Sequence, residues 1–162
     1  MTTAENPADF RREVQDVAEQ YPESRSAVLP ALRLAQERHG GWLPPEAFIE
    51  VGEALDLTPG YCRAVASFYD MFHLEPVGRH LVEVCTNICC GLRGAQAVLE
   101  AFERELGAAP GGTSADGEFT LRAVECIGGC GWPTVVAVDD YHGLNVGADD
   151  VPAIVEELRS GG

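Results

Sequence analysis

The chain has 162 residues, 46% of them hydrophobic, and a formal net charge of −15. This length allows one domain or two small ones with a hydrophobic core. So negative a surface repels phosphate, which argues against nucleic acid and anionic lipid as partners and favours a protein with a basic face.

The polar, acidic N-terminus over residues 1–9 lacks the basic and apolar regions of a signal peptide. The sequence also contains no run of about 18 or more apolar residues, so we expect no direct membrane insertion. These features predict a cytoplasmic protein. In that compartment the six cysteines are reduced thiols or metal ligands rather than disulfides.

The first half of the chain has the periodicity of packed helices. Apolar residues recur at helical spacing in four segments, residues 6–22, 26–39, 46–55 and 58–69. Asn6-Pro7 and Thr58-Pro59 begin the first and the fourth segment with a capping residue followed by proline. We therefore expect an N-terminal helical bundle, with the domain boundary after residue 77.

The most aromatic stretch of the chain, residues 67–74, follows the fourth predicted helix. Aromatic clusters usually contribute to a core, and we expect this one to do so. A docking edge for a partner protein is the alternative.

From residue 79 onwards the pattern changes to alternating strands and helices. Strands are predicted over residues 80–85, 119–125, 134–138 and 141–145, and helices over 92–106 and 151–158. The first two strands can lie in one sheet through a helical crossover. The order β-α-β-β-α is that of a thioredoxin-like sheet. The predicted fold class is α+β: a helical bundle over residues 1–77, then a thioredoxin-like α/β domain with a small four-stranded sheet over residues 78–162.

Five of the six cysteines lie in two short loops, each following a predicted strand. Cys85, Cys89 and Cys90 lie in the first loop, and Cys126 and Cys130 in the second. Two strands that end side by side bring four thiolates to one end of a sheet. A [2Fe–2S] cluster needs two thiolates on each iron, and the glycines around both loops let backbone N–H groups approach the sulfurs.

The same cysteines allow chemistries other than a [2Fe–2S] cluster. A zinc-binding interaction module with four cysteine ligands is the main alternative, although zinc knuckles favour two-residue spacers. A thioredoxin-type redox pair requires Cys-x-x-Cys, which is absent. Spacing alone allows either Cys89 or Cys90 to pair with Cys85. Cys62, among apolar residues of a predicted helix, is expected to be a buried small hydrophobe.

Five segments in this order and spacing resemble a known family. They are Phe68-Tyr69-x-Met71-Phe72, Pro76-Val77-Gly78-Arg79-His80, Val84-Cys85-x4-Cys90-x-Leu92-x-Gly94-Ala95, Asp116-Gly117-x-Phe119-Thr120-Leu121 and Val124-Glu125-Cys126-x3-Cys130. Over roughly residues 26–158 the chain resembles the E subunits of NADH-quinone oxidoreductase (respiratory complex I), which are thioredoxin-like [2Fe–2S] ferredoxins. Small subunits of NAD-dependent formate dehydrogenases and bidirectional hydrogenases are related to these.

The resemblance implies one [2Fe–2S] cluster per chain with Cys85, Cys90, Cys126 and Cys130 as its ligands. It thereby favours Cys90 over Cys89, and it implies no catalytic residue on this chain. We also expect Pro133 to shape the wall beside the cluster through a cis bond.

The function implied is that of an electron-transfer subunit that exchanges single electrons with the flavin of an NADH-oxidising partner subunit. FMN and NADH are then bound by the partner, in agreement with the lack of a G-x-G-x-x-G motif after a strand. The chain is expected to be part of an enzyme complex, without catalysis of its own, at the inner face of the cell membrane. An equivalent subunit of a formate dehydrogenase or hydrogenase is the alternative, and the sequence leaves a homodimer open.

Overall fold

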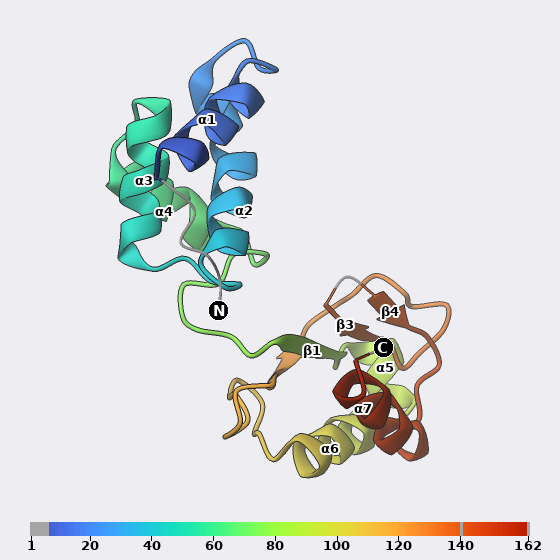
Figure 1. Ribbon diagram of the computed structural model, residues 1–162. Helices are drawn as coiled ribbons and strands as arrows, with labels where there is room; N and C mark the ends of the chain where they lie inside the picture. The colour runs from blue at the N-terminus through green and yellow to red at the C-terminus, as the bar shows by residue number, and fades with distance from the viewer. Residues whose placement is uncertain (1–6, 140, 162) are drawn as a thin grey trace. The chain divides into compact units, whose positions relative to one another are not determined.

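The computed structural model describes residues 7–139 and 141–161. The chain divides into two compact units, Met1–Pro76 and Val77–Gly162, which are described in turn (Figure 1). Among the described residues, no helix is both long and apolar enough to cross a membrane.

The first unit contains the four expected helices, with altered ends. They are α1 (Pro7–Ala18), α2 (Val28–Arg38), α3 (Pro45–Leu55) and α4 (Pro59–Phe68). The first helix ends four residues earlier than predicted, and a 3₁₀ turn at Ser24–Ala27 precedes α2. Thr58 caps α4 as expected, because its hydroxyl accepts a hydrogen bond from the Tyr61 N–H at 3.2 Å. The predicted cap at Asn6 lies outside the described residues.

The helical unit has its own core, to which all four helices contribute. Val14 of α1, Leu32 of α2, Val51 of α3 and Cys62 of α4 are completely buried in it. The expectation that Cys62 is a buried small hydrophobe is therefore confirmed. Its burial raises the pKa of its thiol, so the thiol stays neutral and apolar.

The expectation that the aromatic stretch 67–74 belongs to this core is largely wrong. Phe72 is buried, but Phe68 is 81% exposed and Met71 is 56% exposed. The helix ends at Phe68, because the backbone of Tyr69 is extended. Beyond it, the Gln36 side chain forms hydrogen bonds with the Met71 carbonyl and the His73 N–H and fixes the path of the chain. The chain therefore leaves the helix before most of these side chains can reach the core.

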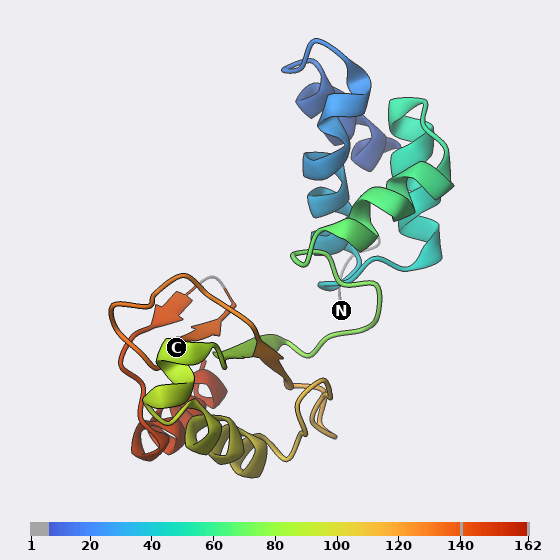
Figure 2. The same ribbon diagram turned by 180° about the vertical axis from the view of Figure 1, so that it is seen from behind.

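The second unit is built on a four-stranded sheet of order β2-β1-β3-β4. Its strands are β1 (His80–Cys85), β2 (Phe119–Val124), β3 (Val136–Val138) and β4 (Tyr141–Gly143). β1 and β2 are parallel, while β3 is antiparallel to both β1 and β4. The crossover helix α6 (Ala95–Leu106) and the last helix α7 (Val151–Arg159) lie on the same side of the sheet in both views (Figures 1 and 2). The predicted α+β class with a four-stranded thioredoxin-like sheet is confirmed.

One face of this sheet supplies the core of the second unit. Val82 and Val84 of β1, Phe119 and Leu121 of β2, and Phe102 of α6 are completely buried together. Alternate residues of the strands point to the opposite face. There Glu83 and Arg122, which are register partners, form an ion pair at 3.9 Å.

The structure corrects the sequence analysis beside the first cysteine loop. The helix predicted over 92–106 begins only at Ala95, as α6, and is preceded by a short helix that was not predicted, α5 (Ile88–Leu92). The break comes at Gly94, whose φ of 96° few other residues adopt. The third strand begins at Val136 rather than at 134. The expected cis bond before Pro133 is also wrong, because the cis bond joins Pro133 to Thr134.

Candidate metal centre

The two cysteine loops leave the sheet at the same end because β1 and β2 are parallel and in register. Cys85, the last residue of β1, is paired with Val124, the last residue of β2. Beyond them the Thr86 N–H and hydroxyl both donate to the Val124 carbonyl, at 2.9 and 3.2 Å. The ends of the two strands are thereby held together, and each loop starts from a fixed position.

The first loop turns directly into α5, which determines the direction of its cysteines. The Asn87 side chain accepts a hydrogen bond from the Ile88 N–H at 2.7 Å and caps the helix. One turn of helix then places Cys90 in the interior, with 1% exposure, and leaves Cys89 half-buried. Cys85 is likewise 2% exposed. Burial thus distinguishes Cys90 from Cys89, which the spacing in the sequence alone did not.

The second loop is more open to solvent. Cys126 and Cys130 are both exposed. Within the loop the Gly128 N–H donates to the Cys126 sulfur at 3.3 Å, from a glycine with a φ of 88°. Gly129 lies against the wall behind the loop, where a Cβ atom would come within 2.8 Å of the Val135 Cγ2.

That wall is formed by the segment leading into β3. Val135 is buried in a small cluster with Cys85, Cys90 and Ala95, against which Ile127 also packs. Its carbonyl accepts from the Cys85 N–H at 3.0 Å, and its own N–H bonds to the sulfur of Cys90. Val135, in the segment just before β3, therefore contacts both buried cysteines of the first loop, Cys85 and Cys90.

The thiols of the first loop are coupled through a hydrogen bond. Burial acts to raise the pKa of Cys85, but the N–H groups of Asn87 and Ile127 and the Cys90 thiol donate to its sulfur and lower that pKa. Burial raises the pKa of Cys90, and the charges of Cys85 and Cys130 add to the effect. The two sulfurs of this pair therefore lie within hydrogen-bonding reach of each other.

The thiols of the second loop form another pair. The charge of Cys126, together with a hydrogen bond between the two sulfurs, raises the pKa of Cys130. Cys130 also responds to the charges of Cys89 and Cys85, so the two loops are close enough to interact. No three His, Cys, Asp or Glu side chains of the described chain converge as ligands of one metal ion. The arrangement is instead two pairs of sulfurs, which is the donor set of a two-iron cluster.

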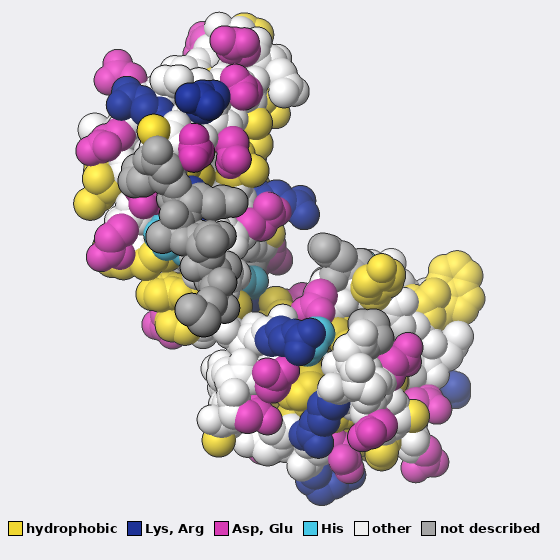
Figure 3. Space-filling view, viewed as in Figure 1, with side chains coloured by type: hydrophobic (Ala, Val, Ile, Leu, Met, Phe, Trp, Pro, Cys, Tyr) yellow, Lys and Arg dark blue, Asp and Glu magenta, His cyan; other side chains and the backbone are white. Residues whose placement is uncertain are grey.

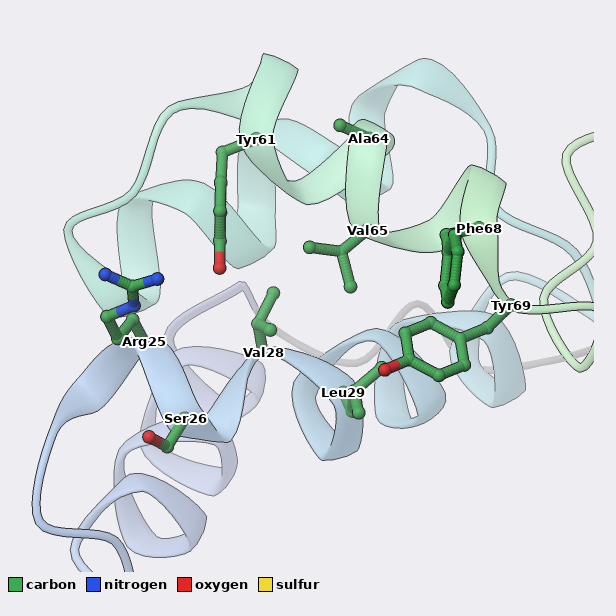
Figure 4. A pocket seen from close by; sticks show the side chains of 9 residues that line it. All are labelled: Arg25, Ser26, Val28, Leu29, Tyr61, Ala64, Val65, Phe68 and Tyr69. Carbon is green, nitrogen blue, oxygen red and sulfur yellow. The ribbon is translucent and has the colours of Figure 1, made fainter.

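A separate feature is an open groove in the helical unit, between the start of α2 and α4 (Figure 4). Its volume is about 570 Å³, and it is lined by Arg25, Ser26, Val28, Leu29, Tyr61, Ala64, Val65, Phe68 and Tyr69. Val65 and Tyr61 point from α4 across the groove toward Val28 and Leu29, and the Arg25 guanidinium lies 6.0 Å from the centre of the Tyr61 ring (Figure 4). The rings of Phe68 and Tyr69 meet edge to face at one end, with centres 5.1 Å apart.

Several contributors to the centre were missed from the sequence. The N–H groups of Asn87, Ile127 and Val135 are backbone donors, and no residue type marks such a group. The glycines of the loops were expected to let N–H groups approach the sulfurs, as Gly128 does, but the wall behind Gly129 depends on the segment leading into β3. A signal was available for Asn87, which is a good helix cap two residues before the Cys89-Cys90 pair.

Comparison with known proteins identifies the class to which this fold and this donor set belong. The family described as thioredoxin-like [2Fe-2S] ferredoxin matches residues 14–159. The chain belongs to this family, whose cofactor is a [2Fe–2S] cluster. That membership decides between the two metal chemistries in favour of iron and sulfide over zinc.

Curated relatives cover most of the chain, and all three described here are E subunits of NADH-quinone oxidoreductases. The second such E subunit of Rhizobium meliloti is 42% identical over 152 residues, which are 93% of this chain and 89% of the relative. The one from Rickettsia bellii is 37% identical over 90% of this chain and 89% of its own length. The one from Pseudomonas aeruginosa is 35% identical over 90% of this chain and 87% of its own.

A solved structure shares the fold. It is a chain of an NAD⁺-reducing [NiFe]-hydrogenase in the H₂-reduced state, which superimposes with a TM-score of 0.73 over 83% of this chain and 22% of that chain. At 22% sequence identity this comparison shows likeness of fold.

Proposed function

We propose that the chain is the [2Fe–2S] electron-transfer subunit of an NADH-quinone oxidoreductase, with Cys85, Cys90, Cys126 and Cys130 as the cluster ligands. The observation that carries the proposal is the meeting of two thiol pairs at one end of the in-register strands β1 and β2. The names of the curated relatives support the choice of complex. The domain that holds the cluster is the second unit, for which the sequence predicts residues 78–162.

The residues present fit such a group. A [2Fe–2S] cluster supplies reversible one-electron chemistry when bound. Hydrogen bonds from Asn87, Ile127, Val135 and Gly128 already point at cysteine sulfurs and stabilise negative charge on them. Gly129 leaves space against Val135 that a Cβ atom would fill. The chain thus provides four thiolates, their hydrogen-bond donors and a close-packed wall.

The exposure of the ligands indicates the side on which electrons are exchanged. Cys85 and Cys90 are buried, whereas Cys126 and Cys130 face solvent. Large apolar side chains also lie exposed on this unit: Ile88, Leu92, Trp132, Tyr141 and Leu144. In the space-filling view, hydrophobic side chains gather near β4 on a surface otherwise rich in acidic groups (Figure 3). A partner that docks over the second loop covers the two exposed ligands.

The proposed partner is the flavin- and NADH-binding subunit of the same complex, so FMN and NADH are bound there and not by this chain. Through its partners the chain is peripheral to the inner face of the cell membrane. The groove of the helical unit provides a second contact. Its exposed Phe68 and half-exposed Tyr61 and Tyr69 form an aromatic surface on an acidic protein, which suits an apolar segment flanked by basic residues. A homodimer is not required by this function.

The experiment that tests the proposal is spectroscopy of the purified chain together with isolation of its native assembly. We expect a reddish-brown protein with two iron and two sulfide per chain and an EPR signal on reduction. An affinity-tagged chain is expected to co-purify with a flavoprotein that oxidises NADH. A colourless protein containing zinc would refute the cluster. Co-purification with hydrogenase or formate dehydrogenase subunits would reassign the complex.

A further inference from the structure

Thr134 is a buried residue whose side chain has no partner. Only 2% of its surface is exposed, and its hydroxyl oxygen has no hydrogen bond among the described residues. Its carbonyl, by contrast, accepts from the Val146 N–H at 2.9 Å. Folded proteins pair nearly all their buried polar groups, so an unpaired hydroxyl calls for a ligand that satisfies it.

The residue that follows Thr134 in the chain contacts the sulfurs of the first loop. The next residue, Val135, donates its N–H to the Cys90 sulfur and accepts the Cys85 N–H. Covalent geometry puts the Thr134 Cα about 2.4 Å from that Val135 nitrogen. Thr134 also follows Cys130 by four residues. It is thus adjacent in the chain to the residue that contacts Cys85 and Cys90.

The other unpaired buried atom of the described chain behaves differently. It is Nε2 of His80, at the opposite end of β1 from Cys85. The His80 ring is already held through Nδ1 by the Asp139 carboxylate at 2.8 Å and stacks on Phe119. One nitrogen of this ring therefore has a partner, whereas the Thr134 side chain, whose hydroxyl is a rotatable donor, has none.

We propose that the Thr134 hydroxyl donates a hydrogen bond to a sulfur of the bound [2Fe–2S] cluster, either an inorganic sulfide or a cysteine ligand. This inference rests on the proposed function. The other donors to sulfur described at the site, apart from the thiols themselves, are backbone N–H groups. Thr134 would add a side-chain donor, and it takes no part in ligation.

A donor to sulfur favours the reduced state, because reduction adds negative charge to the cluster and its ligands. Thr134→Val removes the donor and nearly keeps the side-chain shape. We therefore expect it to shift the reduction potential downward, so that less of the cluster is reduced at a given applied potential. Thr134→Ser keeps the hydroxyl and is expected to restore the potential toward that of the unaltered protein.

The test is an EPR-monitored redox titration of the full-length holoprotein and its Thr134→Val and Thr134→Ser variants. Pulsed EPR after exchange into D₂O adds a second readout: beside the exchangeable protons of the backbone N–H donors, we expect one exchangeable-proton coupling that is present in the unaltered protein and absent from Thr134→Val. Thr120→Val serves as the control, because it removes a buried hydroxyl that is bonded to Gly78 and Thr113. It should leave the potential unchanged.

The outcomes separate the two proposals. An unaltered protein without iron and sulfide refutes the proposed function itself. A normal cluster whose potential and proton coupling are the same in Thr134→Val overturns the role of Thr134 alone. If Thr134→Val does not fold, Thr134→Ala takes its place beside Thr134→Ser: the same reduction potential in these two variants overturns the inference.

Discussion

The two cysteine loops differ in how many thiols they hold, and this asymmetry can be tested residue by residue. The second loop has Cys126 and Cys130 and no third cysteine. We predict that Cys126→Ala or Cys130→Ala abolishes the cluster, because neither loss can be replaced locally. Iron and sulfide analysis with the visible spectrum measures the effect. Cys62→Ala is the matched control, because Cys62 is buried in the helical unit, and it should retain full iron content.

Cys89 gives a second prediction at the same scale. It is half-buried while its neighbour Cys90 is 1% exposed and bonded to both Cys85 and the Val135 N–H. Cys89→Ser is therefore expected to keep the EPR signal, and Cys90→Ser to lose or alter it. The reverse result, loss of the signal in Cys89→Ser alone, would make Cys89 the ligand.

The sequence indicates the proposed ligand residues but not their surroundings. Cysteine is a residue type with a chemistry of its own, so two loops of cysteines are visible in the letters. The Val135 N–H, the unpaired Thr134 hydroxyl and the wall behind Gly129 have no such mark. They depend on β3 returning antiparallel beside β1, which pairs residues 52 to 56 positions apart, and short-range patterns do not report such pairings.

At the scale of elements, the second loop and its wall form one packed unit. A Cβ atom at Gly129 would lie 2.8 Å from the Val135 Cγ2 and 3.3 Å from the Leu144 Cδ2. Gly129→Ala is therefore expected to displace Val135, whose N–H contacts Cys90, and to hasten loss of the cluster to a chelator severalfold. A Cβ atom added at Gly131 meets open space, so Gly131→Ala should lose its cluster to the chelator at the rate of the unaltered protein. Equal rates in the two variants would show that the wall is not rigid.

The groove between α2 and α4 gives the prediction for association. Phe68 is 81% exposed at one end of it. We expect Phe68→Ala to weaken binding of the flavoprotein partner about tenfold or more, as for an aromatic anchor at an interface. The unfolding free energy should change little, since Phe68 has little contact to lose. Ile49→Ala removes another exposed apolar side chain, from α3 outside the groove, and is expected to bind normally. Binding is measured by titration calorimetry with the purified partner.

The helices and strands were predicted well where the apolar pattern extends over a long segment. Four helices of the first unit, the parallel pair β1–β2 and the last helix follow from apolar spacing and caps. The five-residue α5 was missed, because it is too short for a helical period and contains Gly91. The aromatic stretch after α4 was misassigned to the core, because composition does not reveal that the chain leaves the helix at Tyr69.

The whole molecule has two separate sets of buried residues, one in each unit. No residue of the helical core occurs in the cores of the second unit. Leu32→Ala should therefore lower the unfolding free energy of the helical unit by about 2–5 kcal/mol while leaving the cluster in place. Leu121→Ala, at an equally buried position, should release the cluster at lower urea. Circular dichroism and visible absorbance, followed together in urea, distinguish the two. Cluster loss in parallel with unfolding of Leu32→Ala would contradict this independence.

The register of β1 and β2 has a consequence for how the second unit folds. With Cys85, Cys90, Cys126 and Cys130 as the proposed ligands, a bound cluster would cross-link the chain between Cys85 and Cys126, across 41 positions that contain α5, α6 and β2. By the loop-entropy relation used for disulfides, a closure of this length disfavours the unfolded chain by about 4 kcal/mol. Cluster insertion would then also stabilise the fold of the second unit, and we expect proteases to cleave the iron-free chain faster than the chain that holds the cluster.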